Sequence, residues 1–203
     1  MSVTPVTQKG SETRASILDR AVDLASVEGL EGLTIGRLAA ELRMSKSGLF
    51  GHFGSKQELQ LATVEAAAQR FRDKVIVPSL DAPEGAERIR AMGDRYLDQM
   101  GDYSGGCFWA ATSAEHDDRP GPVRDAIAAA LTAWLGELER QARIAGVERP
   151  ERFAFELYAL VMGVNSRYRL SGDERVFEYA REALDRLLAE LPGEIGYSAA
   201  SVE

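Results

Sequence analysis

Apolar residues recur at helical spacing along almost the whole chain, and this periodicity is the feature that most restricts its fold. Ile17, Ala21, Leu24 and Ala25 share one helical face, and similar stripes recur as far as Leu191. Valine, isoleucine and threonine are too scattered to indicate strands. The pattern therefore predicts an all-α fold.

Capping residues, glycines and prolines divide this pattern into about nine helices. Ser55 and Glu58 form the sequence of a capping box, in which each side chain bonds the other's backbone N–H. We expect helices at about residues 11–28, 34–42, 45–53, 55–77, 83–100, 107–114, 127–146, 150–172 and 173–191.

Composition and cysteine usage exclude several classes of protein. The 203 residues are 45% apolar and 28% charged, which is typical of a globular chain. One cysteine and two histidines rule out an intrachain disulfide and give metal chemistry little to build on, so we expect no cofactor or metal. The sequence has neither a membrane-length apolar stretch nor a secretory signal, so we expect a cytoplasmic protein.

The net charge of −8 is distributed unevenly along the chain. Residues 1–56 carry seven basic and six acidic side chains, whereas the remainder has a net charge of −9. Lys46 and Lys56 bracket one short segment of this less acidic part. The charge asymmetry therefore points to the N-terminal quarter as the candidate site for nucleic acid, despite the acidic total.

Two short predicted helices, at 34–42 and 45–53, are joined by only about three residues. This spacing is typical of a helix-turn-helix, in which the second helix enters the DNA major groove. Lys46, Ser47 and Gly48 lie at the start of that second helix, where the helix dipole and a lysine favour a phosphate.

The same segment resembles the tetracycline-repressor (TetR) family of bacterial transcription regulators. The resemblance rests on the residues from Thr34 to Ala39 and from Met44 to Leu59. It implies an all-α homodimer that binds a palindromic DNA operator, and a larger domain that binds a small effector and dimerises. Release of the operator by the effector, hence repression, is the commoner mode in the family. The expected organisation is a flexible tail at 1–10, a DNA-binding domain at 11–56, a ligand-binding and dimerisation domain at 57–192 and a frayed tail at 193–203.

Carried over to this chain, the resemblance implies that Thr34 and Lys56 contact phosphates. It also implies recognition-helix positions for Lys46, Ser47, Gly48, Leu49 and His52. Phe50 departs from the family's usual tyrosine and Gly51 from the large residue often found there. Fewer contacts with bases are therefore expected from these two positions. Arg43 replaces a glycine in the turn, at a conformational cost of about 1 kcal/mol, and could meet a phosphate. The candidate DNA-binding set is Thr34, Arg37, Arg43, Lys46, Ser47, Gly48, Leu49, Phe50, His52 and Lys56.

The predicted helix at 150–172 carries apolar residues on every face, so one face should meet a partner chain. With the helix at 173–191 it predicts a two-fold four-helix interface, as the resemblance also implies. The interface candidates are Val161, Val164, Leu184 and Leu188.

Sulfur-containing and aromatic side chains with a few polar groups predict a pocket for a small, largely apolar effector, although many of them could simply be core. The candidates are Met92, Tyr96, Gln99, Met100, Cys107, Phe108, Trp109, Trp134, Tyr158, Met162 and Asn165.

Two other functions fit the sequence less well. An enzyme would need a nucleophile and a base, and Cys107 with His116 has no known catalytic spacing, so we expect no enzymatic activity. A helical protein-interaction module without DNA binding fits the acidic C-terminal part but leaves Lys46 and Lys56 unexplained.

Overall fold

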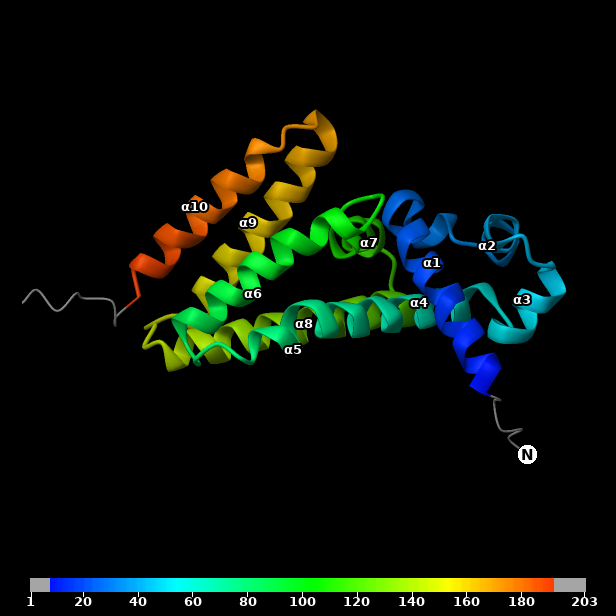
Figure 1. Ribbon diagram of the computed structural model, residues 1–203, viewed down its shortest axis with the longest axis horizontal. Coiled ribbons are helices and arrows are strands. Elements are labelled where there is room, and N and C mark those ends of the chain that lie inside the picture. Colours follow the sequence, from blue (N-terminus) through cyan, green and yellow to red (C-terminus); the bar gives the residue numbers. More distant parts are fainter. Residues whose placement is uncertain (1–7, 192–203) are drawn as a thin grey trace, which may run out of the picture. The chain divides into compact units, whose positions relative to one another are not determined.

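The computed structural model describes residues 8–191, and the side chains of residues 12–191, all within a purely helical fold. The described part contains nine α-helices of eight residues or more and no strand, which confirms the predicted all-α class (Figure 1). These helices are α1 (Gln8–Gly32), α2 (Ile35–Leu42), α3 (Lys46–Phe53), α4 (Lys56–Phe71), α6 (Ala86–Gln99), α7 (Phe108–His116), α8 (Pro122–Ile144), α9 (Pro150–Ser171) and α10 (Arg175–Ala189). Three short turns complete it: η1 (Arg72–Ile76), α5 (Val77–Ser79) and η2 (Met100–Asp102).

The chain forms two compact units that are each built from separate stretches of sequence. Unit 1 contains the described residues up to Lys74 together with Asp98–Leu131, and unit 2 contains Val75–Leu97 and the described residues from Thr132 onward. Helix α7 therefore packs with the N-terminal helices, although it lies far beyond the predicted domain boundary at residue 56. Of the two predicted tails, residues 1–7 and 193–203 lie outside the described residues, while Gln8 already begins α1.

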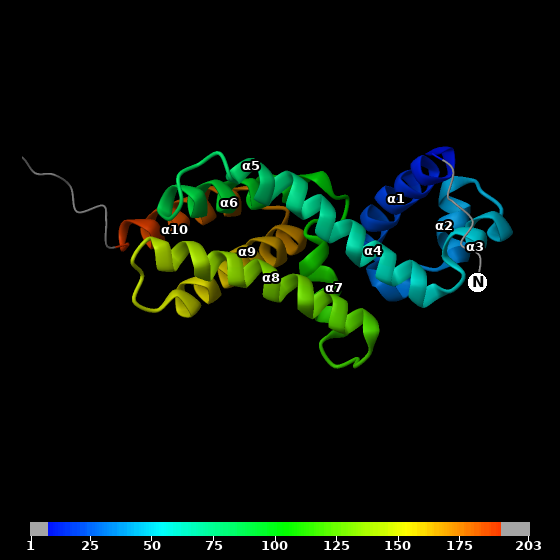
Figure 2. The ribbon, with the colours of Figure 1, turned by 90° about the horizontal axis from the view of Figure 1, so that it is seen from below.

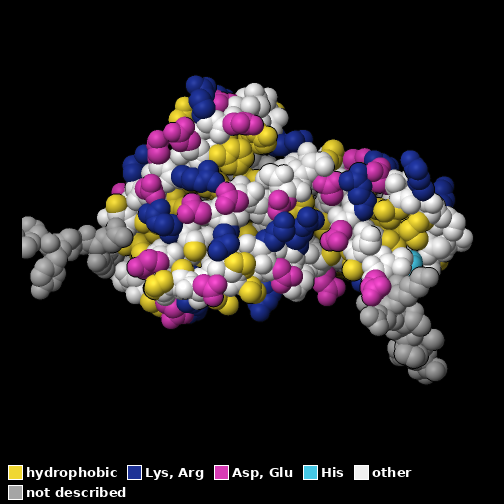
Figure 3. All heavy atoms as spheres, viewed as in Figure 1, with side chains coloured by type: hydrophobic (Ala, Val, Ile, Leu, Met, Phe, Trp, Pro, Cys, Tyr) yellow, Lys and Arg dark blue, Asp and Glu magenta, His cyan; other side chains and the backbone are white. Residues whose placement is uncertain are grey.

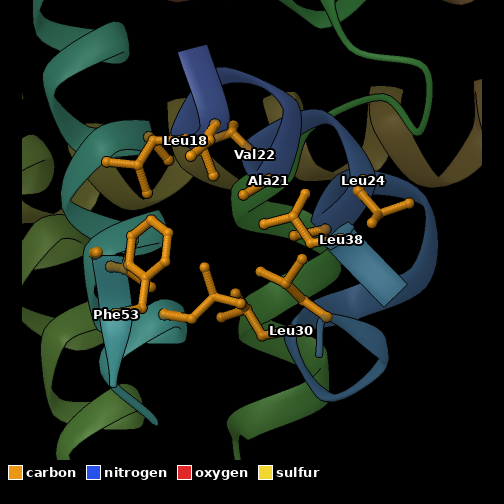
Figure 4. Packing of buried hydrophobic residues seen from close by; sticks show 14 of the residues in the cluster. Leu18, Ala21, Val22, Leu24, Leu30, Leu38 and Phe53 are labelled. Carbon is orange, nitrogen blue, oxygen red and sulfur yellow. The ribbon is translucent and has the colours of Figure 1, made fainter. Parts of the chain in front are cut away.

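The core of unit 1 forms around the apolar stripe of α1, which packs against α2, α4 and α7 (Figure 2). Leu30 and Leu38 are fully buried there and lie near Phe53 from the end of α3 (Figure 4). Leu49 from α3 is fully buried in the same cluster. Burial of these leucines contributes roughly 1.5–3 kcal/mol each, so α2 and α3 are held by packing rather than by their own short hydrogen-bond ladders.

The predicted N-caps are present in the structure. Thr34 Oγ1 accepts a hydrogen bond from the N–H of Arg37 at 3.1 Å, and Ser45 Oγ accepts one from Gly48 at 3.1 Å. Ser55 Oγ likewise accepts from the N–H of Glu58. The second half of the predicted capping box is wrong, because the N–H of Ser55 donates to the carbonyl of Phe53 instead.

Two predicted helix boundaries differ from the structure for identifiable reasons. Helix α4 ends at Phe71 rather than near residue 77, and the chain continues through the π-helical turn η1. Pro78 has no N–H to continue the α-helical ladder, and its ring excludes the carbonyl four residues earlier. Pro83 precedes α6 rather than starting it, because Arg88 ties the connecting loop down through the carbonyls of Leu80 and Ala82.

In unit 2, α9 and α10 form an antiparallel pair, joined at a left-handed Gly172 (Figure 1). Their facing sides bury Leu157, Val161 and Leu184. Helix α6 approaches α10 so closely that a methyl group on Gly93 would lie 2.7 Å from a Leu184 methyl carbon. The unit therefore has a dense interior in which these helices are fixed against one another.

Candidate nucleic-acid interface

Helices α2 and α3 are joined by a closed three-residue turn. The N–H of Met44 donates to the carbonyl of Ala39 at 2.9 Å, and Arg43 adopts left-handed angles of φ 54° and ψ 35°. Arg43 is the only non-glycine residue with positive φ among the described residues, and its side chain is exposed. The expected strained position is therefore occupied as predicted.

Helix α3 has one buried face and one open face. Leu49 and Phe53 anchor it in the core, whereas Lys46 and Ser47 are exposed and Phe50 keeps 55% of its surface open to solvent. Leu49, which was expected among the DNA contacts, is fully buried and cannot reach DNA. The outward residues Lys46, Ser47, Phe50 and Gly51 define the outer face of α3.

Lys46 lies against the start of the preceding helix. A methyl group added to Gly36 would sit 3.4 Å from Lys46 Cε and 4.0 Å from Thr34 Oγ1, so the lysine passes close to the first turn of α2. This brings a lysine ammonium to the positive end of α2, where both favour an anion. Thr34 contributes as the cap of that end.

Arg37 is already engaged by two carboxylates within unit 1. Its guanidinium donates to Glu28 at 2.7 Å and to Glu41 at 2.8 Å, and Glu41 also pairs with Arg20. Hydrogen bonding by Arg37, followed by that of Arg20, lowers the pKa of Glu41. Arg37 thus joins α2 to α1 through its ion pairs. Only its spacing of four residues from Glu41 could have been seen in the sequence.

Lys56 and His52 are the remaining basic candidates. Lys56 Nζ donates to Glu31 Oε2 at 2.8 Å, a pair that joins the start of α4 to the end of α1. His52 is half-buried with its ring 6.2 Å from that of Phe53. The Lys56–Glu31 pair was not predicted, because it depends on how α1 and α4 meet, whereas His52 and Phe53 are neighbours within α3.

Charges of both signs are interspersed on the face shown in Figure 3, with no broad basic field. On this face, attraction for a phosphate backbone is therefore expected from individual cations rather than from a broad field. The local cations around α3 include Arg43, Lys46, the paired Lys56 and Arg14, whose guanidinium lies 5.2 Å from the centre of the Phe53 ring.

The predicted effector residues divide between the two units. Gln99, Met100, Cys107 and Phe108 are buried in unit 1 with the half-buried Trp109, and Met92, Tyr96 and Trp134 are buried in unit 2 with the half-buried Tyr158, Met162 and Asn165. The structure brings together Tyr96 and Trp134, whose ring centroids lie 5.6 Å apart, and Phe108 and Trp109, at 5.1 Å.

Gln99 differs from its neighbours because it carries an unsatisfied polar atom. Its Nε2 donates to the hydroxyl of Tyr103 at 3.1 Å, while its Oε1 is buried without a hydrogen-bond partner among the described residues. Burial raises the pKa of Tyr103 to about 12. A buried acceptor without a partner costs roughly 1–3 kcal/mol, which a bound group with an N–H or O–H would recover.

Cys107 and His116 lie at opposite ends of α7, both buried, so the structure does not bring them together as a dyad. Within residues 8–191 no three metal-ligating side chains are grouped. None of the described helices has both the length and the apolar character needed to cross a bilayer.

The predicted interface residues on α9 and α10 point inward. Val161, Val164, Leu184 and Leu188 are all buried within unit 2, because they form the contact between these helices and the rest of the unit. The opposite face of the pair bears an open apolar groove of about 420 Å³. Its lining residues are Phe155, Glu156, Ala159, Leu160, Ala183, Arg186, Leu187 and Glu190. Helical periodicity had identified every face of α9 as apolar but could not tell which of them the chain itself covers.

Comparison with protein families gives two matches along the chain. Residues 17–63 match the model described as bacterial regulatory proteins of the tetR family. Residues 85–184 match the model of the tetracyclin repressor-like C-terminal domain. The two matches cover more than two thirds of the chain. No curated protein matches it.

Solved structures of similar fold include several regulators. A TetR transcriptional regulator from Chloroflexus aurantiacus is 25% identical with a TM-score of 0.81, covering 91% of this chain and 98% of its own. A TetR-family regulator from Streptomyces coelicolor is 25% identical with a TM-score of 0.78, covering 89% and 96%. AibR, solved in complex with isovaleryl coenzyme A and operator DNA, is 24% identical with a TM-score of 0.70, covering 86% and 98%.

Proposed function

The chain belongs to the TetR family of bacterial transcription regulators, and from this we propose that it is a repressor that leaves a palindromic operator when a small effector binds. The observation that carries the proposal is the outer face of α3, which presents Lys46, Ser47 and Phe50 to solvent while Leu49 and Phe53 anchor the helix. A short helix held this way can enter the major groove without rearrangement. A cytoplasmic location follows from the DNA partner.

We assign different tasks to the residues around α3. Arg43, Lys46, Lys56 and the cap at Thr34 bind phosphates and set the position of the helix, while Ser47 contacts base edges. Phe50 lacks a hydroxyl, so its exposed ring suits an apolar contact such as the methyl group of thymine. Gly51 adds no side chain, which leaves Phe50 room beside a base.

The effector is proposed to be small and largely apolar, with at least one hydrogen-bonding group. Support comes from the buried aromatic and sulfur side chains and from the unsatisfied amide of Gln99. The similar fold of AibR holds an acyl coenzyme A and operator DNA, which supports an effector with an acyl chain as one test ligand. Whatever the ligand, it can shift the DNA equilibrium only by its differential affinity for the free and DNA-bound forms.

We further propose a homodimer through the outer faces of α9 and α10. The open groove containing Phe155, Ala159 and Leu187 would pack against its two-fold copy as a four-helix interface. Dimerisation would place two copies of α3 on successive half-sites of a palindrome.

The test is a titration of the protein against DNA from upstream of its own gene at several salt concentrations. Each phosphate neutralised contributes about −0.9 to the slope of log affinity against log salt. Lys46→Ala should weaken operator and random DNA equally, whereas Ser47→Ala should change the ratio between them. Lys74→Ala, which removes an exposed lysine of η1 that pairs with Asp102, is the matched control. Affinity without salt dependence would contradict DNA binding through phosphates.

A further inference from the structure

Lys56, which is proposed to contact the DNA backbone, forms an ion pair with Glu31 within the protein. We infer that Glu31 occupies the place of a DNA phosphate on Lys56, and that helix α7 holds Glu31 there. This inference rests on the proposed DNA-binding function and concerns the affinity of the protein for DNA. Glu31 would be a built-in competitor that lowers affinity for DNA.

The geometry of the pair is that of an anion at a lysine site. Lys56 Nζ donates to Glu31 Oε2 at 2.8 Å, and Gln60, one turn later on α4, donates to Glu31 Oε1 at 3.3 Å. Lys56 is the first residue of α4, where the helix dipole also favours negative charge. The Glu31 carboxylate thus receives the donors that a phosphate oxygen would receive.

The pair is weak enough for DNA to displace it. The side chains of Lys56 and Glu31 are 40% and 47% exposed, and an exposed pair of this kind shifts an equilibrium by about 1.4- to 5-fold. Hydrogen bonds from Lys56 and then Gln60 lower the pKa of Glu31, so the carboxylate stays charged wherever DNA binding is measured. Competition should therefore reduce affinity by a few fold per protomer without abolishing it.

Glu31 is positioned by a residue from a distant part of the sequence. Gly29, at φ 74°, breaks α1, so the N–H groups of Leu30 and Glu31 begin a new turn. The carboxylate of Glu115 on α7 accepts from both, at 2.7 and 2.9 Å. A side chain at Gly29 would clash with it, since a Cβ there would lie 2.7 Å from the Glu115 oxygens.

Helix α7 links this contact to the proposed effector residues. Phe108 and Trp109 lie on α7 itself, and the loop before α7 is tied to α1 because Asp23 accepts from the N–H of Ser104 at 2.8 Å. A displacement of α7 would therefore alter the cap on Glu31, and through Glu31 the availability of Lys56. The chain thus has a path from α7, through Glu115 and Glu31, to one proposed phosphate contact.

A double-mutant cycle on the full-length protein tests the inference. The probe is a labelled random-sequence duplex, because a phosphate contact does not depend on the operator. Glu31→Gln should tighten binding about 1.4- to 5-fold per protomer when residue 56 is lysine and much less in a Lys56→Gln background. Glu115→Gln should reproduce part of this gain, again only with Lys56 present.

Two controls separate pairing from the simple removal of negative charge. Glu31→Asp keeps the charge but shortens the side chain by one methylene, so it should also tighten binding. Glu58→Gln removes a negative charge from the first turn of α4, the turn that contains Lys56. Its effect on DNA affinity measures what the loss of one nearby negative charge does without the loss of the Lys56 pair. Melting temperatures establish that each variant is folded.

Equal gains from Glu31→Gln in both backgrounds, or a Glu31→Asp variant with wild-type affinity, would overturn the inference while leaving the proposed function intact. A wild-type protein that binds no duplex at low salt would instead overturn the proposed function. The two failures are therefore distinguishable.

Discussion

The N–H of Gly105 donates a hydrogen bond to the side-chain oxygen of Ser26 at 2.9 Å, so the loop before α7 lies directly on α1. A Cβ on Gly105 would lie 1.9 Å from the carbonyl oxygen of Ser26, a position that no side chain can share. Gly105→Ala should therefore force the loop off α1 and lower the free energy of unfolding by about 3 kcal/mol. Gly101→Ala, which meets no atom within 4 Å, is the control and should change it by less than about 0.5 kcal/mol. Urea unfolding measures both, and equal stabilities would contradict the close contact.

Arg43 should trade stability for DNA affinity. Its left-handed backbone costs about 1 kcal/mol in a non-glycine residue, so Arg43→Gly should raise the free energy of unfolding by up to that amount. The same change should weaken DNA binding and flatten the salt slope by roughly 2 for a dimer, since two phosphate contacts are lost. Arg43→Lys keeps the charge and the strain and should change neither property much. An Arg43→Gly variant with an unchanged salt slope would remove this residue from the interface.

Phe50 is expected to read thymine methyl groups. Replacing thymine by uracil at the contacted position should cost about 1 kcal/mol, or roughly fivefold in affinity, for the apolar contact that is lost. The penalty should vanish in Phe50→Ala, which has no ring to make the contact. Phe50→Tyr retains the ring and should keep most of the penalty. If uracil scanning across the operator gives the same profile for wild type and Phe50→Ala, the ring does not read methyl groups.

The outer face of α9 and α10 should control the oligomeric state. Ala159→Glu places a charge in the open apolar groove and should yield monomers with much weaker operator binding, because both half-sites are no longer held together. Val77→Glu, at an exposed apolar position on α5, serves as the control and should remain dimeric. Sedimentation velocity distinguishes the two, and a dimeric Ala159→Glu variant would place the interface elsewhere.

Alkaline titration should reveal the burial of Tyr103. Burial raises its pKa to about 12, against the opposing effect of the nearby Arg70 guanidinium. The folded state then retains a proton that the unfolded chain loses near pH 10, so this residue stabilises the fold below pH 10 and the contribution is lost as the pH rises towards 12. The difference in tyrosinate absorbance between wild type and Tyr103→Phe should therefore titrate near 12. A component titrating near 10 would show that the ring is accessible to water.

Local signals in the sequence predicted the helices better than the contacts between them. Thr34 and Ser45 cap their helices as expected because capping depends on neighbours three residues away. Gly172 ends α9 for an equally local reason. The π-helical turn after Phe71 was missed because it depends on how Pro78 interrupts a long hydrogen-bond ladder.

The candidate site could be predicted only in outline for the same reason. Periodicity shows that Phe155 and Val161 lie on apolar faces of one helix, but only the packing of the unit shows that Val161 is covered and Phe155 open. Glu28, which pairs with Arg37, and Glu31, which pairs with Lys56, both lie on α1, and Glu31 is 25 residues away from Lys56 in sequence. Such pairs require the relative placement of helices, which residue spacing does not contain.

The division of α3 into a buried and an open face has a consequence for how such a regulator evolves. Leu49, Phe53 and the cap at Ser45 hold the helix, and a side chain at Gly51 would meet nothing within 4 Å. Substitutions on the open face can therefore accumulate with little effect on folding. After gene duplication, one copy could acquire a new set of target genes through a few changes there, while the other keeps the original set.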